Sequence, residues 1–383
     1  MSVTAARGFL ASGVAAGIKE SGDRDLALVV NRGPSRAVAG VFTSNRVQAA
    51  PVRWSRRALA DGRIAAVVLN SGGANACTGQ AGAVDALLMA EHTARALDLD
   101  PHEVAVCSTG LIGVMLPMDK VTAGIATAVE RLAPEGGEDA AVAIRTTDSV
   151  HKTAVAARDG WTVGGMAKGA GMLAPGLATM LVVLTTDADV DAEALDATLR
   201  AAVRTTFDRV DSDGCMSTND TVLLLASGAS GVVPEAAEFG EAVHAVCLDL
   251  ARQLIADAEG ASKEIEVTVV GAAAEEDAVE VGRSVARNNL LKCALHGEDP
   301  NWGRVLSAIG TTSAAFDPDR LDVAINDVWV CRNGAAGESR DKVDLSYRRI
   351  TITVDLCAGD SSAVIWTNDL TAEYVHENSA YSS

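Results

Sequence analysis

Short apolar segments separated by turns fill the first third of the chain, and they limit what it can fold into. Three of them have the length and the residue types of β-strands: 26–31, 37–43 and 64–70. A helix is expected over 84–97, followed by another apolar strand that leads into a loop at Gly110. Farther along, Leu195, Leu199 and Val203 recur at helical spacing on one face. The sequence therefore predicts a mixed α/β fold with strands covered by helices.

The second half continues this pattern. A helix is expected to begin near Pro234 and to end at Gly260. Ile265, Val267 and Val269 then alternate as in a half-buried strand. Two further apolar runs, 350–356 and 363–367, are separated by "CAGDSS" and predict a β-hairpin.

Composition excludes several classes of partner. The formal net charge is −19, which argues against nucleic acid or an anionic membrane surface, because both attract basic patches. No apolar run approaches the ~20 residues that a membrane-spanning helix needs. The seven cysteines are scattered and never spaced as CxxC, so neither a disulfide framework nor a structural zinc site is expected. A reducing cytoplasm fits these features.

The segment "KGAGMLAPGLATMLVVLTTD" (168–187) places Thr179 where a glycine-rich loop meets an apolar strand. A threonine hydroxyl is a poor nucleophile unless a base takes its proton. Cleavage of the Ala178–Thr179 bond would supply that base, because the new α-amino group has an ordinary pKa of ~7.7–8.0. Residue types alone leave open the simpler interpretation, a threonine that only begins a strand.

Other patterns support weaker hypotheses. The stretch 169–174 resembles a dinucleotide-binding fingerprint, but Pro175 and a β-branched run follow where a helix is required. The acidic and histidine residues in 296–304 lack the separated second ligand pair of most metal sites, so a structural turn is favoured. Cys215 has no nearby histidine to act as a base.

A set of motifs gives the chain a family resemblance. They cover the sequence in order, and they are "LNSGGANACTG" (69–79), "CSTGLIG" (107–113), "TTD" (146–148), "MAKGAGMLAPGLATML" (166–181), "DGCMSTNDT" (213–221), "EGASK" (259–263), "ARNNLLKCA" (286–294), "HGEDPNWGR" (296–304) and "HENSAYSS" (376–383). In these motifs the chain resembles the ornithine acetyltransferase (glutamate N-acetyltransferase) family, whose members cleave themselves before a threonine.

The resemblance implies a fold and an activity. The implied fold is an αββα sandwich of the N-terminal-nucleophile type, with intertwined α (1–178) and β (179–383) chains assembled as α2β2. The implied reaction moves an acetyl group from N-acetylornithine to Thr179 and then to glutamate, in ping-pong order. No cofactor is implied, and the sequence leaves open whether acetyl-CoA is a second acetyl donor.

The resemblance also assigns roles by matched position. Thr109 and Gly110 match the oxyanion hole. The matched substrate-binding residues are Thr146, Lys168, Thr179, Glu259, Asn378 and Ser383. Thr147 remains an alternative to Thr146. A lysine suits the α-carboxylate of the amino-acid substrates, and Glu259 is expected in the last turn of a helix, where a carboxylate is unfavourable.

Two other functions remain as alternatives. A self-processing aminopeptidase or amidohydrolase would let water resolve the acyl-enzyme, and a non-catalytic binding protein would keep the fold without the chemistry.

Overall fold

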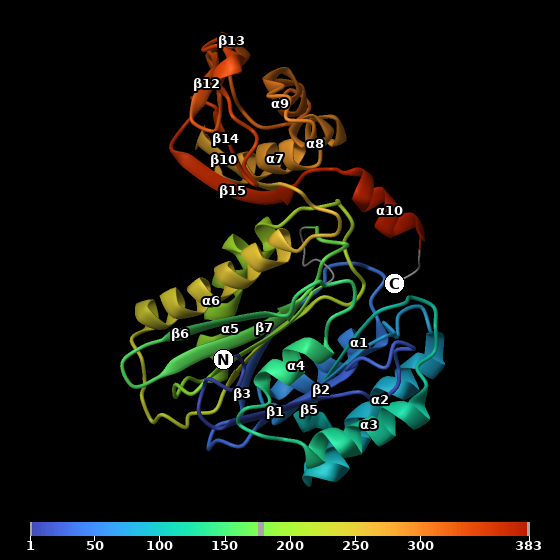
Figure 1. Ribbon diagram of the computed structural model, residues 1–383. Helices are drawn as coiled ribbons and strands as arrows, with labels where there is room; N and C mark the ends of the chain where they lie inside the picture. Colours follow the sequence, from blue (N-terminus) through green and yellow to red (C-terminus); the bar gives the residue numbers. More distant parts are fainter. Residues whose placement is uncertain (1, 175–179, 381–383) are drawn as a thin grey trace. The chain divides into compact units, whose positions relative to one another are not determined.

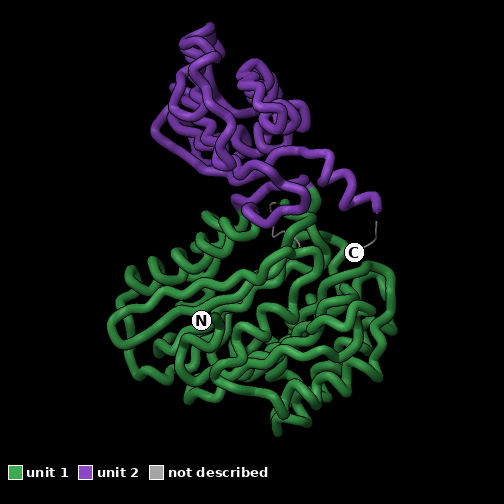
Figure 2. Tube along the Cα trace, in the orientation of Figure 1, with its two compact units in different colours: residues 1–208, 215–254, 383 green, residues 209–214, 255–382 purple. Residues whose placement is uncertain are grey.

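The computed structural model describes residues 2–174 and 180–380, which form two compact units (Figures 1 and 2). Unit 1 comprises the described residues of Met1–Asp208 and Cys215–Leu254, and unit 2 those of Arg209–Gly214 and Ile255–Ser382. These two units do not correspond to the predicted α (1–178) and β (179–383) chains, because unit 1 extends on both sides of the bond between residues 178 and 179. Among the described residues, no helix combines the length and apolar character needed to cross a bilayer.

A four-stranded sheet forms the first layer of strands in unit 1. Its order is β1-β2-β4-β5, with bounds Phe9–Val14, Leu26–Asn31, Ala66–Ser71 and Val104–Thr109. The β4–β5 pair is parallel and is connected through α2 (Gly79–Leu97). Every residue of β2, β4 and β5 is buried, as expected of apolar strands covered on both faces.

A five-stranded sheet forms the second layer. Its order is β3-β9-β8-β7-β6, with bounds Ala37–Phe42, Thr221–Ala226, Leu181–Thr186, Thr162–Lys168 and Lys152–Ala157. Two adjacent interior strands, β9 and β8, follow residue 179 in sequence, whereas β3, β7 and β6 precede it. Segments from both sides of the predicted cleavage point therefore share one sheet.

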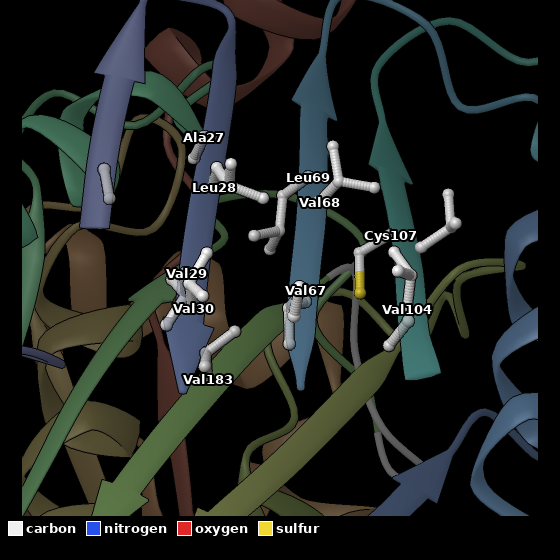
Figure 3. Packing of buried hydrophobic residues seen from close by; sticks show 14 of the residues in the cluster. Ala27, Leu28, Val29, Val30, Val67, Val68, Leu69, Val104, Cys107 and Val183 are labelled. Atoms are coloured by element: carbon white, nitrogen blue, oxygen red, sulfur yellow. The ribbon is translucent and has the colours of Figure 1, made fainter. Parts of the chain in front are cut away.

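Helices cover the outer faces of the two sheets in unit 1 (Figure 1). Val183 of β8 lies beside β2 in Figure 3, and it belongs with residues of β2 and β4 to one apolar cluster formed by both sheets. Helices α2 and α3 (Met118–Glu130) pack on the four-stranded sheet, and α5 (Ala192–Thr205) and α6 (Ala236–Ala256) on the five-stranded one. Two shorter helices, α1 (Ala50–Ala58) and α4 (Gly137–Ala143), pack against β5 and β1. Unit 1 thus has the expected αββα layering.

Unit 2 is a smaller sheet with helices. The sheet order is β13-β12-β11-β14-β10-β15, with bounds Ala335–Ala336, Val328–Arg332, Asp322–Ile325, Arg349–Asp355, Glu264–Ala272 and Ser361–Asn368. Its helices are α7 (Glu275–Ala286), α8 (Asn289–His296), α9 (Trp302–Ile309) and α10 (Ala372–Ala380). Buried and more exposed residues alternate along β10 and β14, so one face of the sheet packs on the core of the unit.

The predicted hairpin near the C-terminus is wrong. The strands β14 and β15 both form, but β10 lies between them, parallel to β14 and antiparallel to β15. This register places Ile265 beside Ile350, so alternate apolar residues of the two strands lie on the same buried face. The short connection between β14 and β15 suggested that they pair with each other, but it carries no information about β10, which lies far from both in sequence.

Strand β7 was not predicted, because two glycines interrupt its apolar pattern. Both glycines are required by close packing. A Cβ at Gly164 would lie 2.3 Å from the carbonyl oxygen of Ser2, and one at Gly165 would lie 2.7 Å from Leu184 Cδ2.

Candidate active site

The first part of the site is the end of β5, where Thr109 is the last residue of the strand and is buried. The amides of Gly72 and Gly73 both donate to the Thr109 carbonyl, at 2.9 and 3.0 Å. Gly110 follows with φ +125°, and a Cβ there would lie 2.5 Å from Gly73 N, so only glycine fits. Its own amide makes no hydrogen bond within the part of the chain that the structure describes. A hydroxyl therefore occurs beside a backbone N–H that makes no hydrogen bond to the described residues.

Lys168 links the five-stranded sheet to the end of β5 in the four-stranded sheet. It is the last residue of β7 and lies opposite Leu181, the first residue of β8. Its side chain is only 2% exposed, and Nζ donates to Thr109 Oγ1 over 3.2 Å. The structure thus brings together Thr109, Gly110 and Lys168, which sequence reasoning had placed in one site.

A buried aspartate compensates the charge of Lys168. Asp148 lies with Oδ2 4.0 Å from Lys168 Nζ, and its Oδ1 accepts a hydrogen bond from Lys152 Nζ at 2.7 Å. The amides of Gly169 and Thr146 also donate to its carboxylate, at 2.6 and 3.0 Å. Burial alone would raise the pKa of Asp148. The charges of Lys168 and Lys152, together with the hydrogen bonds from Lys152 and the Gly169 amide, outweigh burial and lower the pKa to about 2. Asp148 is thus an ionised carboxylate held beside two buried lysines.

Sequence reasoning missed the roles of Asp148 and Lys152. Asp148 was visible only as the end of the "TTD" motif, and Lys152 as a lysine in an apolar strand, where burial without a partner is rare. Thr146 reaches the cluster through its backbone amide. Both Thr146 and Thr147 are half-buried, so exposure does not decide which of them contacts a substrate.

Asp220, directly before β9, is a second buried aspartate at this end of the five-stranded sheet. Its Oδ1 accepts a hydrogen bond from the amide of Met180 at 3.0 Å. Burial raises the pKa of Asp220 well above its usual range. The Met180 amide, the hydroxyls of Ser217 and Thr43 and the charge of Lys168 oppose this shift but are smaller. The pKa values of the two aspartates are therefore shifted in opposite directions.

Three predicted residues lie outside the described residues: Ala178, Thr179 and Ser383. The described chain resumes after the predicted cleavage point at Met180, beside β8. Residues 169–174 of the rejected dinucleotide motif contain no helix in the structure.

The remaining two predicted residues belong to unit 2. Asn378 of α10 donates through Nδ2 to Glu259 Oε2 at 3.0 Å. Glu259 was expected in the last turn of a helix, and this prediction is wrong because α6 ends at Ala256. The argument from the helix dipole therefore does not apply to Glu259. Gly260, where the helix was expected to end, lies four residues beyond its last residue.

The loop that carries Glu259 is held to the start of α10. Thr371 donates through Oγ1 to the Gly260 carbonyl at 2.7 Å and accepts a hydrogen bond from the Tyr374 amide at 2.9 Å. A Cβ at Gly260, whose φ is +60°, would lie 2.2 Å from Tyr374 N. The loop and the helix are therefore fitted closely to each other within unit 2.

The 296–304 motif has a structural role in unit 2. His296 ends α8, and its Nδ1 lies 3.0 Å from Oδ2 of the buried Asp369. The amides of Ser262 and Lys263 donate to the other oxygen of Asp369, each at 2.9 Å. The described residues contain no group of histidine, cysteine and acidic side chains arranged to hold a metal ion.

Known proteins are similar to this sequence over its whole length. A family model described as "ArgJ family" matches residues 10–383. The arginine biosynthesis bifunctional proteins ArgJ of Streptomyces avermitilis and Streptomyces coelicolor are 73% and 71% identical over 383 residues, and the matches cover the whole of both chains. A solved structure of arginine biosynthesis bifunctional protein ArgJ from Bacillus halodurans is 35% identical, with a TM-score of 0.50, and covers 51% of this chain and 97% of its own. The chain belongs to the ArgJ family.

Proposed function

We propose that this chain is a glutamate N-acetyltransferase of arginine biosynthesis that takes its acetyl group from N-acetylornithine. The observation that carries the proposal is the contact between Lys168 and Thr109 at the end of β5. It places a buried cation and a hydroxyl beside the Gly110 amide, next to the strand that follows the predicted nucleophile. The shared name of the Streptomyces relatives supports the pathway.

In the first half-reaction Thr179 Oγ attacks the acetyl carbonyl carbon of N-acetylornithine, and its proton passes to the Thr179 α-amine. The carbonyl oxygen becomes an oxyanion, which the Thr109 hydroxyl and the Gly110 amide stabilise by donating hydrogen bonds. The C–N bond then breaks, and ornithine leaves with the proton. The product is an acetyl ester on Thr179.

In the second half-reaction the neutral amine of glutamate attacks the ester carbon. The α-amine of Thr179 accepts the proton from glutamate and returns one to Thr179 Oγ as the C–O bond breaks. The proposal needs no cofactor, because the substrates and the chain supply every group used. Acetyl-CoA would enter only as an alternative acetyl donor in the first half-reaction.

Lys168 has two roles in this mechanism. Its ammonium group donates to Thr109 Oγ1, so the hydroxyl proton of Thr109 must point elsewhere and remains available to an oxyanion. The ammonium group of Lys168 also suits a substrate carboxylate. Glu259 and Asn378 are proposed to bind the polar groups of the amino-acid substrates.

The nucleophile is proposed to arise by self-cleavage between Ala178 and Thr179, giving chains of 178 and 205 residues. The strand pairs β7–β8 and β3–β9 would hold these chains together, and the resemblance implies an α2β2 assembly. The solved Bacillus halodurans chain is about half as long as this one, as a product of such a cut would be. All seven cysteines are free of disulfides, which supports a cytoplasmic location.

The first experiment is N-terminal sequencing of the purified protein, which should show a new chain that begins Thr-Met-Leu-Val. The second is incubation with N-acetylornithine, with and without glutamate, and acetylglutamate should form only with both. Acetate release at the same rate without glutamate would favour the hydrolase. A full-length protein without transfer activity would favour the binding protein, and acetyl-CoA as sole donor tests the additional activity.

A further inference from the structure

Two consecutive buried residues, Asn219 and Asp220, contact both sheets of unit 1 at the site. Asn219 donates through Nδ2 to the carbonyls of Ala74 and Ser108, at 2.6 and 2.8 Å. Ser108 immediately precedes Thr109 in β5. Asn219 therefore fixes the backbone that carries the proposed oxyanion donors.

Asp220 contacts the other sheet. The Met180 amide that donates to its Oδ1 belongs to the peptide bond that joins Met180 to Thr179. The Met180 carbonyl is also engaged, because it accepts a hydrogen bond from the Thr221 amide at 3.1 Å. Met180 lies one residue before β8, where no neighbouring strand supplies an acceptor for its N–H, and the side chain of Asp220 supplies it instead. The residue after the predicted nucleophile is thus held by both of its backbone groups.

We propose that Asn219 and Asp220 are positioning residues that fix the separation between the oxyanion donors at 109–110 and the nucleophile at 179. This inference rests on the proposed function. Reacting groups must be aligned closely, and a misplacement of about 1 Å lowers a rate by on the order of a hundredfold. Asn219 and Asp220 are adjacent in the chain. They therefore restrain the end of β5 at Thr109 and the start of β8 at Leu181 from moving relative to each other.

The surroundings of Asp220 indicate that it acts without a charge. Its side chain is fully buried, and its Oδ2 makes no hydrogen bond to the described residues. No described lysine, arginine or histidine forms an ion pair with Asp220, unlike Asp148. A neutral carboxyl keeps one acceptor oxygen for Met180, and its O–H can donate from the Oδ2 position.

This difference gives a matched pair of variants. Asp220→Asn keeps an acceptor oxygen for the Met180 amide and places N–H donors where a neutral carboxyl has its O–H, so self-cleavage and kcat should stay within about threefold of wild type. Asp220→Ala removes the acceptor, and both rates should fall by about a hundredfold. KM for N-acetylornithine should change less than twofold in either variant, because neither changes a proposed substrate contact.

The measurements are the rate of appearance of the Thr179 chain on denaturing gels and the steady-state kinetics of the processed fraction, with thermal unfolding as the control for folding. Asn219→Ala should lower kcat in the same way as Asp220→Ala. A folded Asp220→Ala variant with wild-type rates would overturn the positioning role, and a folded but inactive Asp220→Asn variant would show that the carboxylate charge is required. A wild-type protein that is neither cleaved nor active would refute the proposed function itself.

Discussion

The two groups of predicted site residues are built in opposite ways. In unit 1, Thr109 and Lys168 end buried strands, and a fully buried aspartate balances the lysine. In unit 2, Glu259 lies in a loop and Asn378 on α10, a helix with no buried residue. Groups that stabilise a transition state must not move, whereas groups that bind a flexible amino acid can rearrange. Changes in the first group should therefore affect kcat or folding, and changes in the second should affect KM.

The largest effect is expected for Thr179→Ala, which removes the hydroxyl used in both cleavage and transfer. This variant should remain a single folded chain without measurable transferase activity, as judged by denaturing gel and acetylglutamate formation. Thr179→Ser is the matched control, because it keeps a hydroxyl and should retain cleavage. Residual transfer by purified Thr179→Ala would place the nucleophile elsewhere.

The next effect is a loss of transition-state stabilisation in Thr109→Ala. Removal of one oxyanion donor lowers kcat by about 10²–10³. Thr109→Ser retains the donor and should lose much less. Steady-state kinetics separate kcat from KM, and a change confined to KM would contradict the oxyanion assignment and the comparison between the two groups.

Asp148→Asn tests the buried charges of unit 1. It leaves two buried lysines without their anion and should lower the free energy of unfolding at pH 7 by about 3 kcal/mol. The pKa of Asp148 is lowered to about 2 in the folded protein, so its contribution is present above pH ~4 and is lost as pH falls toward 2. The difference in the free energy of unfolding between Asp148→Asn and wild type should therefore decrease as the pH falls over that range. Urea unfolding curves recorded at several pH values measure this difference. A difference that stays constant would show that the carboxylate charge is not what stabilises the cluster.

The smallest effect is expected at the C-terminus. Deletion of residues 379–383 removes the end of α10 and Ser383 but keeps Asn378 and the contact of Thr371 with Gly260. Self-cleavage and folding should be unchanged, and KM for the amino-acid substrates should rise about tenfold, equivalent to ~1.4 kcal/mol of binding. A C-terminal tag should have a milder effect. Wild-type kinetics in the truncated enzyme would show that these five residues do not contribute.

Local pattern predicted several elements well. The segment 26–31 coincides with β2, and the helical spacing from Leu195 to Val203 corresponds to α5. The failures involve contacts between distant segments. The placement of β10 between β14 and β15 depends on strand pairing that local periodicity does not encode. The same holds for the candidate site: the motifs and their family resemblance indicated Thr109 and Lys168, but the roles of Asp148, Asn219 and Asp220 appear only when the strand ends are brought together.

The five-stranded sheet combines strands from both sides of residue 179, which would affect how a chain cut before Thr179 recovers from unfolding. In this sheet β8 and β9 lie between β3 and β7, so strands from before residue 179 flank strands from after it. An intact chain assembles this sheet in a unimolecular reaction, but a cleaved one must find its other half, and its yield then depends on protein concentration. Self-cleavage before Thr179 would thus turn a foldable precursor into a product that is maintained by slow unfolding rather than by ready refolding.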